Sequence, residues 1–273
     1  MKIIFFGTPD YVLPILINLH KKFVTGPGRS PIVAVVTQSP KPVGRMQIKT
    51  YSPIDKWAHE HGVEIYYDFN KTLPEADLGV CASFGSIIPK SVIDHFGFGI
   101  LNIHPSLLPK YRGASPIQTS IAEGDNLTGV TIIKMDEKVD HGPIISQFKE
   151  DILPDDTNET LRERLFVRSA QVLIDLIPNY LSGKVKPKEQ NHDEATYTKI
   201  VKKEDGFVDL KKDDPVQIER KLRAYTPWPG IWTHLPNGKR LKILPGDMVQ
   251  IEGKNPITKK QFQASYSQFS HQS

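Results

Sequence analysis

The chain has 273 residues, of which 38% are hydrophobic and 24% charged, a composition that excludes wholesale disorder and is typical of a globular protein. Its single cysteine, Cys81, excludes an internal disulfide framework and a cysteine-based metal site, and no apolar run is long enough to span a bilayer. Residues 1–183 carry 18 Lys and Arg against 20 Asp and Glu, whereas residues 184–273 carry 17 against 11. The basic C-terminal third favours a polyanionic partner.

Short apolar segments alternate with segments of helical period over the first two thirds of the chain. Strands are expected at residues 2–6, 31–37, 78–83, 99–104, 128–135 and 144–148. Helices are expected after the first strand with Thr8 as N-cap, at 53–61 with Ser52 as N-cap, at 89–95 and at 157–181. Residues 41–52 are polar and contain proline and glycine, so a loop is expected there. This alternation predicts an α/β fold with a mainly parallel sheet.

The composition changes after Gly183. Residues 184–200 begin charged and proline-bearing, which indicates a linker. Beyond them the pattern predicts short strands, turns and one helix at 215–224. The sequence therefore predicts a larger domain at 1–183, a linker at 184–200 and a small β-rich domain at 201–273.

A polar pair ends the strand expected at 99–104. Asn102 and His104 are two residues apart, so their side chains point to the same face of that strand. Pro105 cannot donate to a sheet ladder and ends the strand. Asp140 lies in a turn between two expected strands, where a carboxylate can face a cleft. An amide, an imidazole and a carboxylate are thus placed where one reaction could use all three.

This set of groups suits acyl transfer. Asn102 and His104 can hydrogen-bond a carbonyl oxygen that is becoming an oxyanion. Asp140 can orient the ring of His104 and take a proton, directly or through water, from an attacking amine. The sequence places no serine or cysteine as an activated nucleophile. We therefore expect direct transfer between two bound substrates through a tetrahedral intermediate.

Each residue alone also has a purely structural interpretation. Asn102 would cap a turn, His104 would be a hydrogen-bonded core histidine, and Asp140 would stabilise an Asx-turn. The histidines show no ligand spacing such as His-Glu-x-x-His, so no metal site is expected. The turn at residues 7–9 lacks the Gly-x-Gly-x-x-Gly pattern, so a nicotinamide cofactor is not expected either.

The segments around these residues resemble the 10-formyltetrahydrofolate-dependent formyltransferases. Order and spacing agree at residues 102–109 (Asn-Ile-His-Pro-Ser-Leu-Leu-Pro), at 112–113 (Arg-Gly) and at 140–143 (Asp-His-Gly-Pro). The resemblance covers roughly residues 1–180 and implies a Rossmann-like formyltransferase domain that uses 10-formyltetrahydrofolate as formyl-donating co-substrate, without a metal. It implies catalytic roles for Asn102, His104 and Asp140, and a folate site lined by Ser106, Leu107, Leu108 and Pro109.

Three further segments resemble the branch of this family that formylates initiator methionyl-tRNA for translation initiation. Residues 6–9 match its first turn, and residues 224–230 (Ala-Tyr-Thr-Pro-Trp-Pro-Gly) match the motif that opens its C-terminal domain. Residues 41–45 match its loop near the tRNA acceptor end. This last match implies tRNA contacts by Lys41, Pro42, Gly44 and Arg45.

The chain departs from the family pattern at two places. His141 stands where a small residue such as threonine is more usual. In addition, residues 241–244 lead almost directly to residues 249–254. In the family, several strands of an oligonucleotide-binding-type (OB) barrel usually lie between such segments, so a shortened, truncated OB-like domain is expected. That domain keeps basic residues suited to phosphates: Lys239, Arg240, Lys242, Lys259 and Lys260.

Other functions stay open at this point. An amino-sugar nucleotide or glycinamide ribonucleotide could be the formyl acceptor, and a hydrolytic relative would release formate from the same donor. A non-catalytic folate- or RNA-binding protein is the alternative of a different class. Residues 41–52 and 224–230 favour the tRNA acceptor, whereas the shortened C-terminal domain keeps the others open. We expect a cytoplasmic monomer.

Overall fold

The chain forms two compact units in the computed structural model, which describes residues 1–24, 26, 30–43, 46–69 and 71–265. The N-terminal unit comprises residues 1–112, 128–150 and 162–197. The C-terminal unit comprises residues 113–127 and 151–161 and the chain from residue 198 onward. Most of the segment expected as a linker therefore belongs to the N-terminal unit, where it contributes contacts to the site described below.

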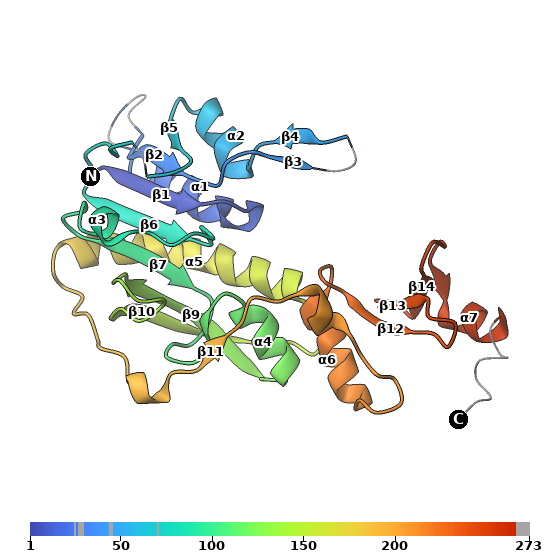
Figure 1. Ribbon diagram of the computed structural model, residues 1–273. Helices are drawn as coiled ribbons and strands as arrows, with labels where there is room; N and C mark the ends of the chain where they lie inside the picture. The colour runs from blue at the N-terminus through green and yellow to red at the C-terminus, as the bar shows by residue number, and fades with distance from the viewer. Residues whose placement is uncertain (25, 27–29, 44–45, 70, 266–273) are drawn as a thin grey trace. The chain divides into compact units, whose positions relative to one another are not determined.

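A mainly parallel sheet organises the N-terminal unit (Figure 1). Its strands in chain order are β1 (Ile3–Gly7), β2 (Ile32–Val36), β5 (Glu64–Tyr66), β6 (Leu78–Ala82), β7 (Ile100–His104), β9 (Leu127–Lys134) and β10 (Ile144–Asp151). Within the described residues the order across the sheet is β10-β9-β7-β6-β1-β2-β5. The strands from β5 to β7 pair in parallel, and β9 pairs antiparallel with β7.

Helices connect and cover these strands: η1 (Asp10–Val12), α1 (Leu13–Lys22), α2 (Pro53–Glu60), α3 (Lys90–Ile93) and α5 (Asn158–Leu181). The central strands read as unbroken apolar runs because both their faces are covered, and every residue of β1 and β6 is buried. Phe6 packs edge-on against Phe84 and Phe96, which fixes the core beside the carboxyl ends of these strands. No described helix is long and apolar enough to cross a membrane.

Several local predictions are confirmed and others are wrong. Ser52 caps α2 by accepting a hydrogen bond from the Asp55 amide, as its sequence position predicts. Thr8 does not cap a helix, because its hydroxyl donates to the Phe84 carbonyl and ties the end of β1 to the loop after β6. The loop expected at residues 41–52 is instead a hairpin, in which β3 (Lys41–Val43) pairs antiparallel with β4 (Ile48–Thr50). Proline is compatible with such an edge strand, so Pro42 does not prevent the pairing.

The C-terminal unit is built around a small antiparallel sheet. Its strands are β12 (Ile231–His234), β13 (Arg240–Leu244), β14 (Met248–Ile251) and β15 (Ile257–Thr258), paired in that order. Among the described residues the first and last strands do not pair, so the sheet is open and forms no closed barrel. The α/β class with a small C-terminal β domain is thus confirmed.

Helices α4 (Pro116–Glu123), α6 (Pro215–Tyr225) and α7 (Lys259–Ser265) complete the C-terminal unit. The sequence predicted α6 but neither α4 nor α7. Short elements fill the connections: β8 (Arg112–Gly113), η2 (His192–Glu194), β11 (Tyr197–Thr198) and η3 (Lys203–Gly206).

Candidate active site

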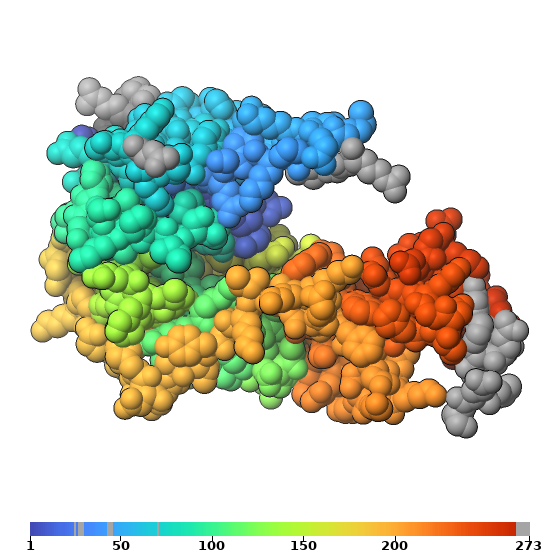
Figure 2. Space-filling view, in the orientation of Figure 1, coloured from blue at the N-terminus to red at the C-terminus, as the bar shows by residue number. Residues whose placement is uncertain are grey.

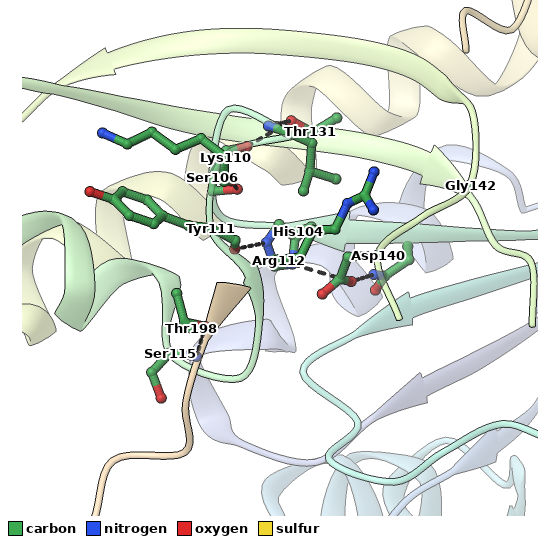
Figure 3. A network of polar contacts seen from close by, with 12 residues as sticks. His104, Ser106, Lys110, Tyr111, Arg112, Ser115, Thr131, Asp140, Gly142 and Thr198 are labelled. Atoms are coloured by element: carbon green, nitrogen blue, oxygen red, sulfur yellow. Dashed lines mark hydrogen bonds and ion pairs between the residues drawn. The ribbon is translucent and has the colours of Figure 1, made fainter. Parts of the chain in front are cut away.

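Asn102, His104 and Asp140 come together at the carboxyl end of β7. Figure 3 shows the His104 and Asp140 side chains facing each other. The Asn102 Nδ2 donates to Asp140 Oδ1 at 3.2 Å, and His104 Nδ1 lies 3.4 Å from the same oxygen. The His104 and Asp140 side chains are 5% and 11% exposed. The expected same-face placement of the pair is therefore observed, and one carboxylate oxygen marks a point within reach of both nitrogens.

The second nitrogen of His104 fixes the orientation of the ring. His104 Nε2 lies 2.9 Å from the Tyr111 carbonyl, and because a carbonyl only accepts, Nε2 carries a proton. Tyr111 adopts a left-handed backbone conformation, with a φ of 62°, which is unusual for a bulky residue. This strained turn aims the carbonyl at the ring and leaves Nδ1 facing Asp140.

Asp140 lies in the turn between β9 and β10, and its backbone is also left-handed, with a φ of 50°. Two contacts hold this turn. Gln190 Nε2 donates to the Asp140 carbonyl at 2.9 Å and to the Gly142 carbonyl at 2.7 Å. A Cβ at Gly142 would stand 1.9 Å from the Lys134 carbonyl oxygen, so this position accepts only glycine.

Arg112 anchors the glutamine. Its side chain is 1% exposed, and its NH2 nitrogen donates to Gln190 Oε1 at 2.7 Å and to His192 Nδ1 at 2.8 Å. A buried guanidinium thus polarises the same amide that holds the Asp140 turn. Sequence reasoning used Arg112 only as part of a motif and missed Gln190, because nothing in the sequence signals a contact between residues 50 positions apart.

His141 also belongs to this network. Its ring stacks on His192 with 3.9 Å between centroids and 5° between planes, and its Nδ1 lies 2.6 Å from Asp136 Oδ2. The ring therefore supports the turn from the side of η2, and its stacking on His192 accommodates a large residue where a small one is more usual. These contacts pack the His141 ring and orient the turn.

Side chains of β9 and β10 hydrogen-bond the backbone of residues 106–109, the segment expected to line a folate site. Thr131 Oγ1 donates to the Ser106 carbonyl at 2.6 Å and accepts from the Leu108 amide at 3.0 Å, while Gln147 Nε2 donates to the Leu108 carbonyl at 3.1 Å. The peptide bond between Leu108 and Pro109 is cis. Thr131 and Gln147, which sequence reasoning missed, thus fix the backbone of this segment.

The side chains of this segment divide into two pairs. Ser106 and Leu108 are buried, and the Ser106 hydroxyl donates to the Lys110 carbonyl at 2.6 Å. Leu107 and Pro109 are partly exposed. Of the four, Leu107 and Pro109 alone leave side-chain surface accessible, and the other two support the backbone.

Cys81 lies opposite Asn102 in the register of β6 and β7, close to the polar cluster. Burial raises the pKa of its thiol to about 12, and the nearby charge of Asp140 acts in the same direction. The thiol therefore stays protonated near neutral pH, which agrees with the absence of a cysteine nucleophile from the expected chemistry.

The hairpin β3–β4 carries part of the expected tRNA loop. Lys41 and Pro42 are exposed on β3, whereas Gly44 and Arg45 lie outside the described residues. The hairpin projects from the N-terminal unit, as Figure 2 shows, and Ile48 on β4 is 60% exposed. It follows β2 at the carboxyl edge of the parallel strands, which is the edge where β7 presents Asn102 and His104.

Metal ligands do not gather in this site. Over the ranges that the structure describes, no group of three or more His, Cys, Asp or Glu side chains is arranged to hold a metal ion. The geometry instead gives an amide donor, a buried imidazole and a carboxylate around one point, with a supported loop beside it. These groups can stabilise an oxyanion and accept a proton.

This combination of fold and site defines a group-transfer enzyme, and the chain belongs to the formyltransferase family. The model of the formyl transferase domain matches residues 1–177, and that of the formyl transferase C-terminal domain matches residues 200–259. Within the family, the chain is similar to methionyl-tRNA formyltransferases. It is 37% identical to that of Agathobacter rectalis over 89% of this chain and 79% of the relative, and 36% identical to that of Bacillus subtilis over 89% and 77%.

Solved structures share the fold. A 4-N formyltransferase from Francisella tularensis has a TM-score of 0.70 at 21% identity, covering 89% of this chain and 96% of its own. An N-formyltransferase from Helicobacter canadensis, in complex with folinic acid and dTDP-3-aminofucose, has a TM-score of 0.69 at 17% identity, covering 92% and 95%. At these identities the likeness concerns the fold alone.

Proposed function

We propose that the chain transfers the formyl group of 10-formyltetrahydrofolate to the α-amine of initiator methionyl-tRNA, which gives formylmethionyl-tRNA for translation initiation. The observation that carries the proposal is the convergence of Asn102 Nδ2 and His104 Nδ1 on Asp140 Oδ1. A formyl oxygen that comes beside this point reaches the same donors. The identity of 37% to a methionyl-tRNA formyltransferase over most of the chain supports the acceptor.

The reaction forms one carbon–nitrogen bond and breaks another. The neutral α-amine attacks the formyl carbon, and the carbonyl π electrons move to oxygen, where Asn102 and His104 donate hydrogen bonds to the developing oxyanion. The attacking nitrogen loses a proton to Asp140, directly or through water. When the intermediate collapses, the bond from carbon to N10 of the folate breaks, and N10 takes the electron pair and a proton. The products are the formamide and tetrahydrofolate.

His104 and Asp140 act as a unit that shares a proton. Because Nε2–H is committed to the Tyr111 carbonyl, Nδ1 is the nitrogen that faces the carboxylate. Two bare lone pairs at this distance would repel, so the contact is attractive when a proton lies on one partner. With that proton on His104 Nδ1, the ring can donate to the oxyanion while the Asp140 carboxylate receives the amine proton.

The co-substrate and the acceptor use different parts of the N-terminal unit in this proposal. The tetrahydrofolate moiety lies against Leu107 and Pro109, with Ser106 and Leu108 holding the backbone of the segment. Lys41, Pro42, Gly44 and Arg45 contact the acceptor end of the tRNA. We assign the catalytic role to residues 1–183 and additional RNA contact to residues 201–273, joined by residues 184–200.

The deciding experiment offers three acceptors in parallel. Purified protein is mixed with labelled 10-formyltetrahydrofolate and methionyl-tRNA, an amino-sugar nucleotide or glycinamide ribonucleotide. We expect label in the tRNA fraction alone. Label in either small acceptor would overturn the assigned acceptor, release of labelled formate without any acceptor product would indicate hydrolysis, and folate binding without turnover would indicate a non-catalytic protein.

The proposal places the enzyme in the cytoplasm, where translation begins, and as a monomer. A monomer suffices because Asn102, His104 and Asp140 all come from one unit of one chain. Sedimentation equilibrium at micromolar concentration tests this point, with a mass near 30.8 kDa as the expected result. A mass of twice that value would contradict it.

A further inference from the structure

Aromatic and basic side chains share one face of the sheet in the C-terminal unit. Along β12, Ile231 and Thr233 are buried, so Trp232 and His234 point to the opposite side. In β13, Leu241 and Ile243 are buried in the same way, and the alternating residues of that strand are more exposed. The sheet therefore has one side in a small core and one side turned outward.

Phe207 extends this outward side. It forms a bridge with Trp232, and the rings of these two residues meet edge to face with centroids 5.2 Å apart. His234 joins them, at 5.2 Å from Trp232 and 6.2 Å from Phe207. The Trp232 indole N–H donates to the Lys203 carbonyl at 3.1 Å, which fixes the central ring. Yet Phe207 remains 42% exposed, and His234 is exposed as well.

Positive charge borders these rings. The Arg240 guanidinium lies 5.1 Å over the Trp232 ring, and Lys242 stands opposite Trp232 in the strand register. A hollow on the same side is lined by Arg240, Lys242 and Gln250 together with one acid, Glu252. Lys242 is exposed. The side chains of Phe207, Trp232, His234, Arg240 and Lys242 are named here the aromatic face.

We propose that the aromatic face binds unpaired nucleotides of the RNA acceptor by stacking their bases, while Arg240 and Lys242 contact the phosphates. The inference rests on the proposed function, since it assumes an RNA partner, and it adds which part of an RNA is bound and by which residues. Flat rings held in place by one another are ready to stack a base without loss of rotamer freedom, and bases of any sequence offer a π-face.

The chemistry of this face favours single-stranded nucleic acid over other partners. Bases in a duplex are already stacked on each other and offer no free face, whereas phosphates alone require only charge. An apolar protein partner would leave the basic border unused, and the C-terminal third of the chain has an excess of basic over acidic residues, which favours a polyanion. Aromatic rings with arginine and lysine at their edge are the combination found in single-strand binding surfaces.

The test measures binding of a fluorescently labelled single-stranded RNA of about eight nucleotides to the full chain by anisotropy, without formyl donor. Phe207→Ala and His234→Ala should each weaken binding by about five- to a hundredfold, the range for one lost base stack. Phe207→Tyr keeps a ring and should bind as the unchanged protein does. Leu210→Ala is the matched control, because Leu210 is 51% exposed in the same unit but outside the aromatic face.

Two results would overturn the inference. One is unchanged binding of the single strand in Phe207→Ala and His234→Ala proteins whose circular dichroism shows that they are folded. The other is equal binding of a duplex of the same length with equal loss in both variants, which would indicate a charge effect. Formyl transfer to methionyl-tRNA is assayed separately, so that loss of transfer with intact oligonucleotide binding would contradict the proposed function and leave the aromatic face standing.

Discussion

The two units use polar and aromatic side chains in opposite ways. In the N-terminal unit, His104, Ser106, Arg112, Thr131 and Gln190 are all nearly buried, with at most 5% of each residue exposed. In the C-terminal unit, Phe207, His234 and Lys242 lie exposed on one face of an open sheet. The buried groups form hydrogen bonds with one another or with nearby backbone, whereas the exposed groups leave surface accessible to a partner.

This contrast follows from what each task requires. Transfer of a formyl group depends on positions fixed to a fraction of an ångström, which only a packed and hydrogen-bonded shell can provide. Contact with a long polyanion depends on accessible area and charge, and tolerates variation in the partner. Substitutions among the buried groups of the first unit should therefore change kcat, and substitutions on the aromatic face of the second should change KM for the RNA.

The largest effects are expected from Asp140→Ala and, next to it, Asn102→Ala. Loss of one oxyanion donor should lower kcat by about 100- to 1000-fold, and Asp140→Ala should nearly abolish transfer because the amine proton and the orientation of His104 are lost together. Single-turnover formylation of methionyl-tRNA measures this. Thermal unfolding should show both variants to be folded, and near-normal turnover in either would disprove the assigned roles.

The next effect tests whether the buried shell positions Asp140. Gln190→Glu keeps an acceptor for Arg112 but cannot donate to the Asp140 and Gly142 carbonyls, so the turn should shift. We expect kcat to fall by up to about 100-fold with KM for both substrates nearly unchanged. Steady-state kinetics measures the split.

The matched control is Gln217→Glu, which makes the same chemical change at an exposed position of α6. It should leave both constants unchanged. If Gln190→Glu raised KM and left kcat intact, the glutamine would be a binding residue and the positioning role would be wrong.

The residues in these two predictions also show which parts of the site could be predicted from the sequence. The six strands expected in the first domain, the shared face of Asn102 and His104, and the Ser52 cap all follow from local patterns, and the structure confirms them. Asp140 could be placed because its turn lies between two recognisable strands. Gln190 could not, because its role depends on contacts with Arg112 and Asp140 that no local periodicity encodes.

The errors have equally local causes. Thr8 has the sequence context of an N-cap, but its hydroxyl donates to the Phe84 carbonyl in the loop after the neighbouring strand β6. The polar composition of residues 41–52 predicts a loop, since a two-stranded hairpin of exposed residues buries no alternating face that a sequence pattern could report. In both cases the structure depends on contacts between segments that are apart in the sequence, which a local pattern does not encode.

A smaller effect is expected from added salt, which should weaken RNA binding and leave the catalytic step unchanged. Raising monovalent salt from 50 to 200 mM should weaken RNA binding by roughly sevenfold if Arg240 and Lys242 neutralise two phosphates of a single strand. The value of kcat at saturating RNA should stay constant, since the catalytic groups are buried. Initial rates at several salt concentrations check this, and a fall in kcat with unchanged KM would contradict the division of tasks.

The smallest expected effect compares one helix cap from each unit. Ser52 caps α2 and also hydrogen-bonds the buried hydroxyl of Thr37 at 2.9 Å, so Ser52→Ala removes a cap and a partner of a buried group. About 2 kcal/mol of local stability should be lost. Asp214 caps α6 through a single exposed bond of 3.3 Å to the Val216 amide, so Asp214→Ala should cost about 1 kcal/mol or less. Hydrogen exchange of peptides from α2 and α6 measures each loss. A greater loss in α6 would show that exposed contacts in the C-terminal unit are as strongly coupled as the buried contacts in the N-terminal unit.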